Sequence, residues 1–407
     1  MSARCVHPFP SVTTNLTALD GNRYTKANTR LDPSQPGYAA LKLHSNLRKL
    51  VIGQEEAIAQ IVDVYQSWLA GLTSPGRPIG SFLFLGPTGT GKTRIVEAVA
   101  ELLLGHPQAI VRIDCAEFQQ SHEVAKLIGS PPGYLGHRET HPVLCQEALS
   151  RYQDRKARIG LVLFDEIEKA SEALWNLLLG ILDKATLTLG DNRKVDFSLA
   201  MIFMTSNLDA AGMESLITPS LGFAASEIAI RPSNSATDEN LNRKLARAGV
   251  EALRRKFPPE LVNRIDKIAV FKPLGAADLD RILSIELDLL QKRVLASLNA
   301  SPFVFKLSPE ARAYLLREGT NARYGARHLK RTIERTMVHP LANLMASYQI
   351  RSGDFIKIDF DPESGSLVFI KEAEQLPACT MSEMIAILTD SRVGNATGRP
   401  LNRKSIP

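Results

Sequence analysis

Gly86-Pro87-Thr88-Gly89-Thr90-Gly91-Lys92-Thr93 is the stretch that decides the fold, because it fits the pattern G-x-x-x-x-G-K-[ST] without a mismatch. It follows the apolar run 81–85 and precedes the amphipathic stretch 94–104. In this strand, loop and helix setting, backbone N–H groups turn toward a bound phosphate and the positive helix end strengthens their field. The alternative is a glycine-rich turn that binds nothing, and the match at all eight positions disfavours it.

The side chains of this loop have distinct expected roles in binding ATP and Mg²⁺. Lys92 is expected to reach the β- and γ-phosphates as a point charge, and the Thr93 hydroxyl to ligate the metal ion. The residues of the loop predicted to bind nucleotide are Pro87, Thr88, Gly89, Thr90, Gly91, Lys92 and Thr93.

A second apolar run, 161–164, is expected to be a buried strand, and it ends in Asp165-Glu166. In-line attack on a phosphate needs both a metal and a base. We therefore expect Asp165 to hold the metal ion and its water shell, and Glu166 to polarise the attacking water. Glu168 and Lys169 are interpreted as a solvated helix start.

A third apolar run, 199–204, ends in Thr205-Ser206-Asn207. An amide at this strand tip could hold the attacking water without adding charge. An Asn after a strand is by itself more often a turn former. Only its place after the first two motifs favours a catalytic role for Asn207.

These motifs and their surroundings resemble the second ATPase module of the Clp group of AAA+ unfoldases and disaggregases. The resemblance runs from about residue 45 to about residue 371, and the segment 77–89 is nearly identical to the sequence typical of the family. It implies an α/β fold: a P-loop parallel sheet flanked by helices, followed by a smaller helical domain with a terminal β-hairpin. By the same resemblance, Val51 and Ile52 pack against adenine.

Two arginines take roles from this resemblance. Arg264 lies in the segment 257–266, which resembles the box that supplies an arginine finger to the neighbouring subunit. Arg327 lies in the segment 325–331, which resembles the sensor-2 box that reports the γ-phosphate. A guanidinium fork suits a phosphate that develops charge. A surface salt bridge is the alternative for any single arginine, and the length of both matched boxes disfavours it.

The segment Gly133-Tyr134-Leu135-Gly136 resembles the pore loop that grips substrate in this group. An exposed Tyr134 beside Leu135 offers nonspecific apolar area with little rotamer entropy to lose. A plain turn with a surface aromatic is the alternative. The residues that follow, 137–142, are basic where the family is acidic and glycine-rich, which leaves the substrate preference open.

The tripeptide Leu221-Gly222-Phe223 resembles the segment with which protease-linked Clp unfoldases dock onto a barrel protease. Tripeptides are weak signals. We favour a surface loop that tucks Phe223 back onto the body, so a protease partner is not expected.

The pattern of apolar runs divides the chain into four parts. Residues 1–45 show no helical period and are expected to be an irregular arm. Residues 46–273 alternate strands with helices, as the large nucleotide-binding domain requires. Residues 274–372 form the small sensor-2 domain with a hairpin from 354 to 370, and 373–407 form a basic, flexible tail in which a short helix could begin at Met381.

Composition sets the remaining expectations. The chain of 407 residues is 44% hydrophobic, carries a net charge of +6, and has four cysteines without paired spacing. It shows no signal peptide and no run of membrane-spanning length, so a cytoplasmic location is expected. The positive charge is dispersed and no stacking surface accompanies it, which disfavours nucleic acid as a partner.

The function predicted from the sequence is an ATP-dependent unfoldase or remodelling chaperone that threads polypeptides through a ring. The resemblance implies a homo-oligomer, and specifically a homohexamer. Two alternatives stay open: an ATP-switched AAA+ scaffold that does not thread, and a nucleic-acid-remodelling AAA+ ATPase. The scaffold would keep the ATPase residues without needing Tyr134.

Overall fold

The structure, a computed structural model, describes residues 31–129, 142–152, 158–208, 247–296, 302–321, 325–377 and 379–384. By its internal contacts the chain divides into Met1–Gly37 and Tyr38–Pro407. The described part of the first unit, residues 31–37, contains a turn in which the Asp32 carboxylate accepts a hydrogen bond from the Ser34 N–H (2.9 Å). All helices and strands below belong to the second unit.

A five-stranded parallel sheet lies at the centre of the nucleotide-binding part, with the order β2-β3-β6-β1-β7. Its strands are β1 (Gly80–Leu85), β2 (Val111–Asp114), β3 (Gly160–Asp165), β6 (Ala200–Ser206) and β7 (Lys267–Val270). Every residue of β1 and β6 is buried. Strands covered on both faces read as continuous apolar runs, which is why the sequence shows these segments so clearly.

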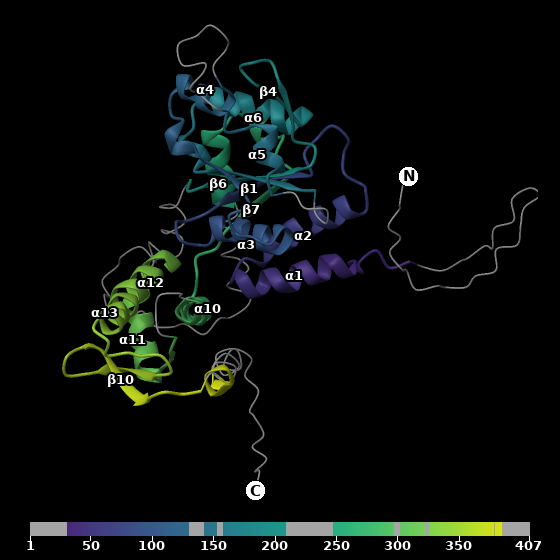
Figure 1. Ribbon diagram of the computed structural model, residues 1–407. Helices are drawn as coiled ribbons and strands as arrows, with labels where there is room; N and C mark the ends of the chain where they lie inside the picture. The colour runs from purple at the N-terminus through teal and green to yellow at the C-terminus, as the bar shows by residue number, and fades with distance from the viewer. Residues whose placement is uncertain are drawn as a thin grey trace, which may run out of the picture. The chain divides into compact units, whose positions relative to one another are not determined.

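Successive side chains along each strand point alternately into two separate hydrophobic cores. Leu83, Phe164 and Ile202 face one core, together with residues of α6 (Glu172–Lys184). Phe82 and Phe203 face the other, where their rings stack with centroids 4.9 Å apart. The helices α1, α2 and α3 lie on one side of β6, β1 and β7, and α4, α5 and α6 lie on the other (Figure 1).

The helices of this part differ widely in length. Their bounds are α1 Tyr38–Leu50, α2 Glu55–Leu69, α3 Lys92–Leu104, α4 Ala125–Ile128, α5 Gln146–Ser150, α6 Glu172–Lys184 and α9 Pro259–Val262, with 3-10 turns at Cys115–Glu117, Ser121–Val124 and Ile167–Lys169. Residues 247–256 are also helical. A small antiparallel pair, β4 (Thr186–Thr188) and β5 (Lys194–Asp196), follows α6.

The C-terminal part packs helices against a three-stranded sheet with the order β10-β9-β8. Its elements are α10 Ala276–Ala296, β8 Val304–Leu307, α11 Pro309–Gly319, α12 Gly325–Ile333, a π-helical turn Glu334–Val338, α13 His339–Ala346, β9 Phe355–Asp361 and β10 Ser366–Ala373. Strands β9 and β10 form the predicted hairpin. The predicted fold class, a helix-flanked parallel sheet followed by a smaller helical part with a hairpin, is therefore confirmed.

The prediction of an irregular arm over 1–45 is wrong at its C-terminal end, because α1 begins at Tyr38. Ala40, Leu43 and Leu47 lie on one face of this helix and are buried in the core beneath α2 and α3. The Thr-, Asn- and Pro-rich composition of the preceding residues hid this short helical period. In the tail, residues 379–384 are helical, which agrees with the short helix expected near Met381, and Met381 packs with Val304 and Phe355.

Candidate active site

The glycine-rich loop joins β1 to α3, as the pattern predicts. Gly86 passes so close to the chain after β7 that a Cβ there would lie 2.6 Å from the Phe271 carbonyl oxygen. Gly91 has a φ of 99°, in the left-handed region that favours glycine. No side chain caps α3 at its start. The N–H groups of its first turn therefore remain available to an anion.

Lys92, the first residue of α3, is only 7% exposed. Its ammonium donates hydrogen bonds to the carbonyl oxygens of Gly86 (2.6 Å) and Pro87 (2.8 Å) and to Asn207 Oδ1 (2.8 Å). Burial lowers the pKa of Lys92 to about 8, while the nearby carboxylates of Glu168 and Asp165 act in the opposite direction. Neutral acceptors thus hold the cation in the loop, where a phosphate can replace them.

Asp165 ends β3, and Glu166 follows it in a left-handed conformation (φ 58°, ψ 48°). Thr205, from the adjacent strand β6, connects the two acids: its hydroxyl donates to Asp165 Oδ1 (2.5 Å) and accepts from the Glu166 N–H (3.1 Å). A left-handed conformation is costly for a residue other than glycine, and such strain concentrates at functional sites. The backbone therefore holds the two carboxylates in different directions.

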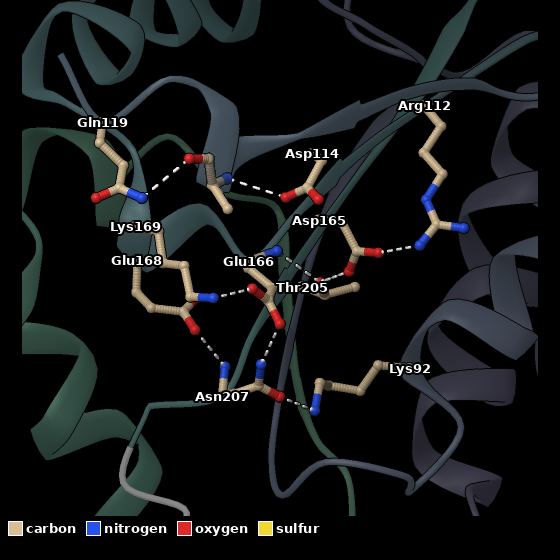
Figure 2. Close-up of polar contacts among 11 residues, drawn as sticks. Lys92, Arg112, Asp114, Gln119, Asp165, Glu166, Glu168, Lys169, Thr205 and Asn207 are labelled. Atoms are coloured by element: carbon tan, nitrogen blue, oxygen red, sulfur yellow. Dashed lines mark hydrogen bonds and ion pairs between the residues drawn. The ribbon is translucent and has the colours of Figure 1, made fainter. Parts of the chain in front are cut away.

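Asn207 lies at the centre of the polar network (Figure 2). Its amide oxygen accepts from Lys92, and its amide nitrogen donates to Glu166 Oε1 (3.1 Å). Its backbone N–H donates to Glu168 Oε1 (3.0 Å), and Glu166 Oε2 pairs with Lys169. One neutral side chain thus bridges the loop lysine and the second acid of β3.

These groups surround a cavity of about 360 Å³. Thr93, Asp165, Glu166 and Asn207 line it together with the loop residues from Thr88 to Lys92. Pro87, which was also predicted to bind nucleotide, is not among the described lining residues; it meets the site through its carbonyl contact with Lys92.

Part of the cavity lining is apolar. Val51 and Ile52, which the resemblance assigns to adenine, line the cavity and are buried. The sequence did not identify the other apolar lining residues, which are Leu50, Leu274, Ile282 and Ile285. Helical periodicity assigns Ile282 to the core of the small domain, and nothing in the pattern shows that α10 also faces this cavity.

Arg327 lines the same cavity from α12, whose first turn contacts the glycine-rich loop. The Ala326 N–H donates to the Gly89 carbonyl oxygen (3.1 Å). Gly325 has a φ of 49°, and a Cβ there would lie 2.8 Å from the same oxygen. The start of α12 is thus fitted directly onto the loop.

Arg264 lies apart from these residues. Its guanidinium pairs with Asp183 (2.7 Å), its side chain is 48% exposed, and it is not among the described residues that line the cavity. The structure therefore brings together all predicted catalytic residues except Arg264.

The predicted site residues did not include Arg112 or Gln54, although Gln54 ends the segment 51–54 that resembles the family's adenine-packing segment. Gln54 is buried and donates to the carbonyl oxygens of Thr90 (3.1 Å) and Lys272 (2.9 Å), which ties the loop to the chain after β7. Arg112, on β2, lines the cavity and pairs with Asp165. Both contacts join segments far apart in sequence, so no local signal could have indicated them.

The donor set fits Mg²⁺ carried by a nucleotide. The Asp165 carboxylate and the Thr93 hydroxyl are hard oxygen donors, and both residues line the cavity. No group of three or more His, Cys, Asp or Glu suited to a metal ion occurs among the described residues. Mg²⁺ at such sites is held by one or two protein oxygens plus phosphates and water, which agrees with this sparse set.

The predicted pore-loop residues Tyr134 and Leu135 lie outside the described residues, as do Leu221, Gly222 and Phe223. In the described part of the chain, no helix combines the length and apolar character that crossing a membrane requires.

The glycine-rich loop, the two acids of β3 and the parallel sheet define a P-loop nucleotide-binding protein. Residues 77–268 match the family described as "AAA domain (Cdc48 subfamily)", and residues 274–358 match the "C-terminal, D2-small domain, of ClpB protein". The chain belongs to the Clp-type AAA+ ATPases, which confirms the resemblance.

Relatives and solved structures agree with this family. Chaperone protein ClpB of Aquifex aeolicus is 39% identical over 337 residues, 82% of this chain and 31% of that protein. ClpB of Pseudomonas putida is 39% identical over 317 residues, 78% of this chain and 33% of that protein. An S. cerevisiae Hsp104:casein complex in an extended conformation is 27% identical with a TM-score of 0.67, covering 82% of this chain and 52% of that one. The chain spans about a third of the length of the curated relatives it matches.

Proposed function

We propose that this chain is the ATP-hydrolysing module of a protein-remodelling chaperone that works as a ring, as a homohexamer, and threads polypeptides through its pore. The observation that carries the proposal is the network of Lys92, Asn207 and Glu166 around one nucleotide cavity, in a chain related to ClpB. A cytoplasmic location is part of the same proposal.

Each side chain of the network has a distinct task in hydrolysis. Lys92 exchanges its carbonyl acceptors for the β- and γ-phosphates. Thr93 and Asp165 would hold Mg²⁺, which when bound supplies charge neutralisation for the transferred phosphoryl group. Asn207 orients the attacking water without adding charge.

Glu166 is the proposed base. Both of its oxygens are engaged in the structure, one by Asn207 and one by Lys169. Each carboxylate oxygen offers about two acceptor sites, so Glu166 can accept a hydrogen bond from the attacking water while both contacts are in place.

The two arginines make hydrolysis depend on the position of α12 in the same chain and on the presence of a neighbouring subunit. Arg327 reaches the cavity of its own chain, so it can stabilise the γ-phosphate in cis and transmit its loss to α12. Arg264 points elsewhere and is half exposed, which supports its role as a finger for a neighbouring subunit.

Binding of polypeptide is the further part of the proposal. The solved Hsp104 structure is a complex with casein, and the segment from Gly133 to Gly136 resembles a substrate-gripping loop. An ATP-switched scaffold without threading and a nucleic-acid remodeller are the competing functions. Docking onto a barrel protease through Leu221, Gly222 and Phe223 remains disfavoured on motif length.

A paired measurement on Tyr134→Ala tests threading. ATP turnover should stay within a few-fold of the parent, because Tyr134 lies outside the nucleotide motifs, while ATP-dependent loss of fluorescence from an unfoldable reporter protein should collapse. Tyr134→Phe, which keeps the aromatic area, is the matched control and should retain unfolding. If the parent unfolds no reporter, or Tyr134→Ala unfolds it at the parental rate, the scaffold becomes the better account.

A further inference from the structure

Arg112 places a positive charge on the carboxylate expected to serve the metal. It lies on β2, next to β3, in a register that pairs Asp114 with Asp165. Its guanidinium contacts Asp165 Oδ2 at 2.5 Å and lines the nucleotide cavity. Figure 2 shows Arg112 reaching Asp165 from the side opposite Glu166.

Both carboxylate oxygens of Asp165 have a partner in the structure. Oδ2 accepts from Arg112 while Oδ1 accepts from the Thr205 hydroxyl (2.5 Å). The Asp165 side chain is 14% exposed, whereas that of Arg112 is 56% exposed. The carboxylate is therefore fixed in the protein, and the arginine is the partner that is free to move toward solvent.

We propose that Arg112 is the counter-ion of Asp165 while the site holds no divalent cation, and that Mg²⁺ and the Arg112 guanidinium compete for this carboxylate. The inference rests on the proposed function, which assigns Asp165 to the metal. A guanidinium and a divalent cation on one carboxylate repel each other strongly at such distances. Arg112 is then a positioning residue that sets how strongly nucleotide binding depends on Mg²⁺.

The competition has a direct consequence for nucleotide binding without metal. With Arg112 in place, its positive charge compensates the negative charge of the Asp165 carboxylate. The phosphates then enter a site that does not repel them. Without Arg112, the bare carboxylate opposes the phosphates until Mg²⁺ arrives. Loss of Arg112 should therefore weaken metal-free binding and strengthen metal-saturated binding, because Mg²⁺ then has no competitor for Asp165.

The test measures the dissociation constant of ADP by calorimetry, once in EDTA and once in saturating Mg²⁺. The constant in EDTA divided by the constant in Mg²⁺ is the ratio compared between variants. Arg112→Gln should raise this ratio about fivefold or more, the lower end of common coupling between two ligands. Arg193→Gln is the matched control, because Arg193 is similarly exposed, pairs with Asp191 at 2.7 Å and is not among the described cavity residues. Its ratio should equal that of the parent.

A double-mutant cycle identifies the partner. In an Asp165→Asn background, Arg112→Gln should no longer change the ratio, because no carboxylate is left to compete for. Arg112→Lys, which keeps the charge on a shorter donor, should raise the ratio less than Arg112→Gln, and it serves if the glutamine variant does not fold.

The outcomes separate the inference from the function it rests on. An unchanged ratio in both variants, or an equal loss of ADP affinity with and without Mg²⁺, would overturn the role of Arg112. If the parent itself bound no ADP in either condition, the proposed nucleotide function would fail instead.

Discussion

Lys92 is the residue at which burial and function conflict most directly. Its pKa of about 8 lies below the ordinary value of 10.5, because burial disfavours the charged form. Phosphates favour the charged form, so bound nucleotide raises this pKa. Below pH 8 the lysine is charged in both states. Above pH 8 binding must take up a proton, and affinity falls as pH rises.

The expected result is a constant dissociation constant for ADP up to about pH 8 and a rise above it of at most tenfold per pH unit. The ADP phosphates are already ionised in this range, so they do not account for the change. Titrations between pH 7 and pH 10 measure it. An affinity that stays constant to pH 10 would show that Lys92 keeps its charge in the protein without added nucleotide.

Glu166 offers a second prediction, which separates phosphate capture from water activation. Glu166→Gln keeps an oxygen that can accept from Asn207 but loses the base, so it should bind ATP and turn it over at least about 100-fold more slowly. Lys92→Ala should not bind nucleotide at all. Glu172→Gln, at the exposed start of α6, is the matched control and should hydrolyse normally. Parental turnover by Glu166→Gln would refute the choice of base.

At this scale, the sequence predicts residues that follow strands and misses residues that meet across them. Asp165 and Asn207 stand directly after buried apolar runs, and parallel strands bring their carboxyl ends to one edge. Arg112 reaches Asp165 only because β2 pairs with β3 in a particular register. No pattern within one segment encodes that register.

Among the elements, the fit of α12 onto the glycine-rich loop connects the two parts of the second unit. Gly325→Ala would place a methyl group 2.8 Å from the Gly89 carbonyl oxygen, at a φ of 49°. Either α12 or the loop must then shift. We expect nucleotide affinity to fall about tenfold, because Arg327 and the loop would no longer share one cavity.

Gly105→Ala controls for backbone strain in this experiment. Gly105 also has a positive φ, 79°, but a Cβ there meets nothing within 4 Å. It should lower the free energy of unfolding by about 1 kcal/mol and leave nucleotide affinity unchanged. Equal affinities in the two variants would mean that the close approach at Gly325 has no bearing on the site.

The element pattern of the large sheet was predictable, while short elements were not. Strands buried on both faces give continuous apolar runs, so β1, β3 and β6 stand out in the sequence. The helix α1 was missed because only three of its residues are buried. Strand β8, four residues long beside β9, has too little length for a periodic signal.

On the scale of the whole molecule, Arg327 and Arg264 differ in whether they reach the nucleotide cavity of their own chain. Arg327 lines the cavity of its own chain, whereas Arg264 pairs with Asp183 outside the described lining residues and is 48% exposed. A group that stabilises a phosphate must contact it. If Arg264 serves hydrolysis, it has to serve the cavity of another copy of this chain.

Mixing two inactive variants tests this requirement. Arg264→Ala should bind ATP without turning it over, and Lys92→Ala should not bind it. In a mixed ring, a Lys92→Ala subunit can offer its intact Arg264 to the intact pocket of an Arg264→Ala neighbour, so part of the ATPase activity should return. The double variant Lys92→Ala/Arg264→Ala, mixed in the same way, has no arginine to offer and should restore nothing. If rings shown to be mixed stay inactive with both partners, Arg264 does not complete a neighbouring site, and hydrolysis would not depend on assembly through this residue.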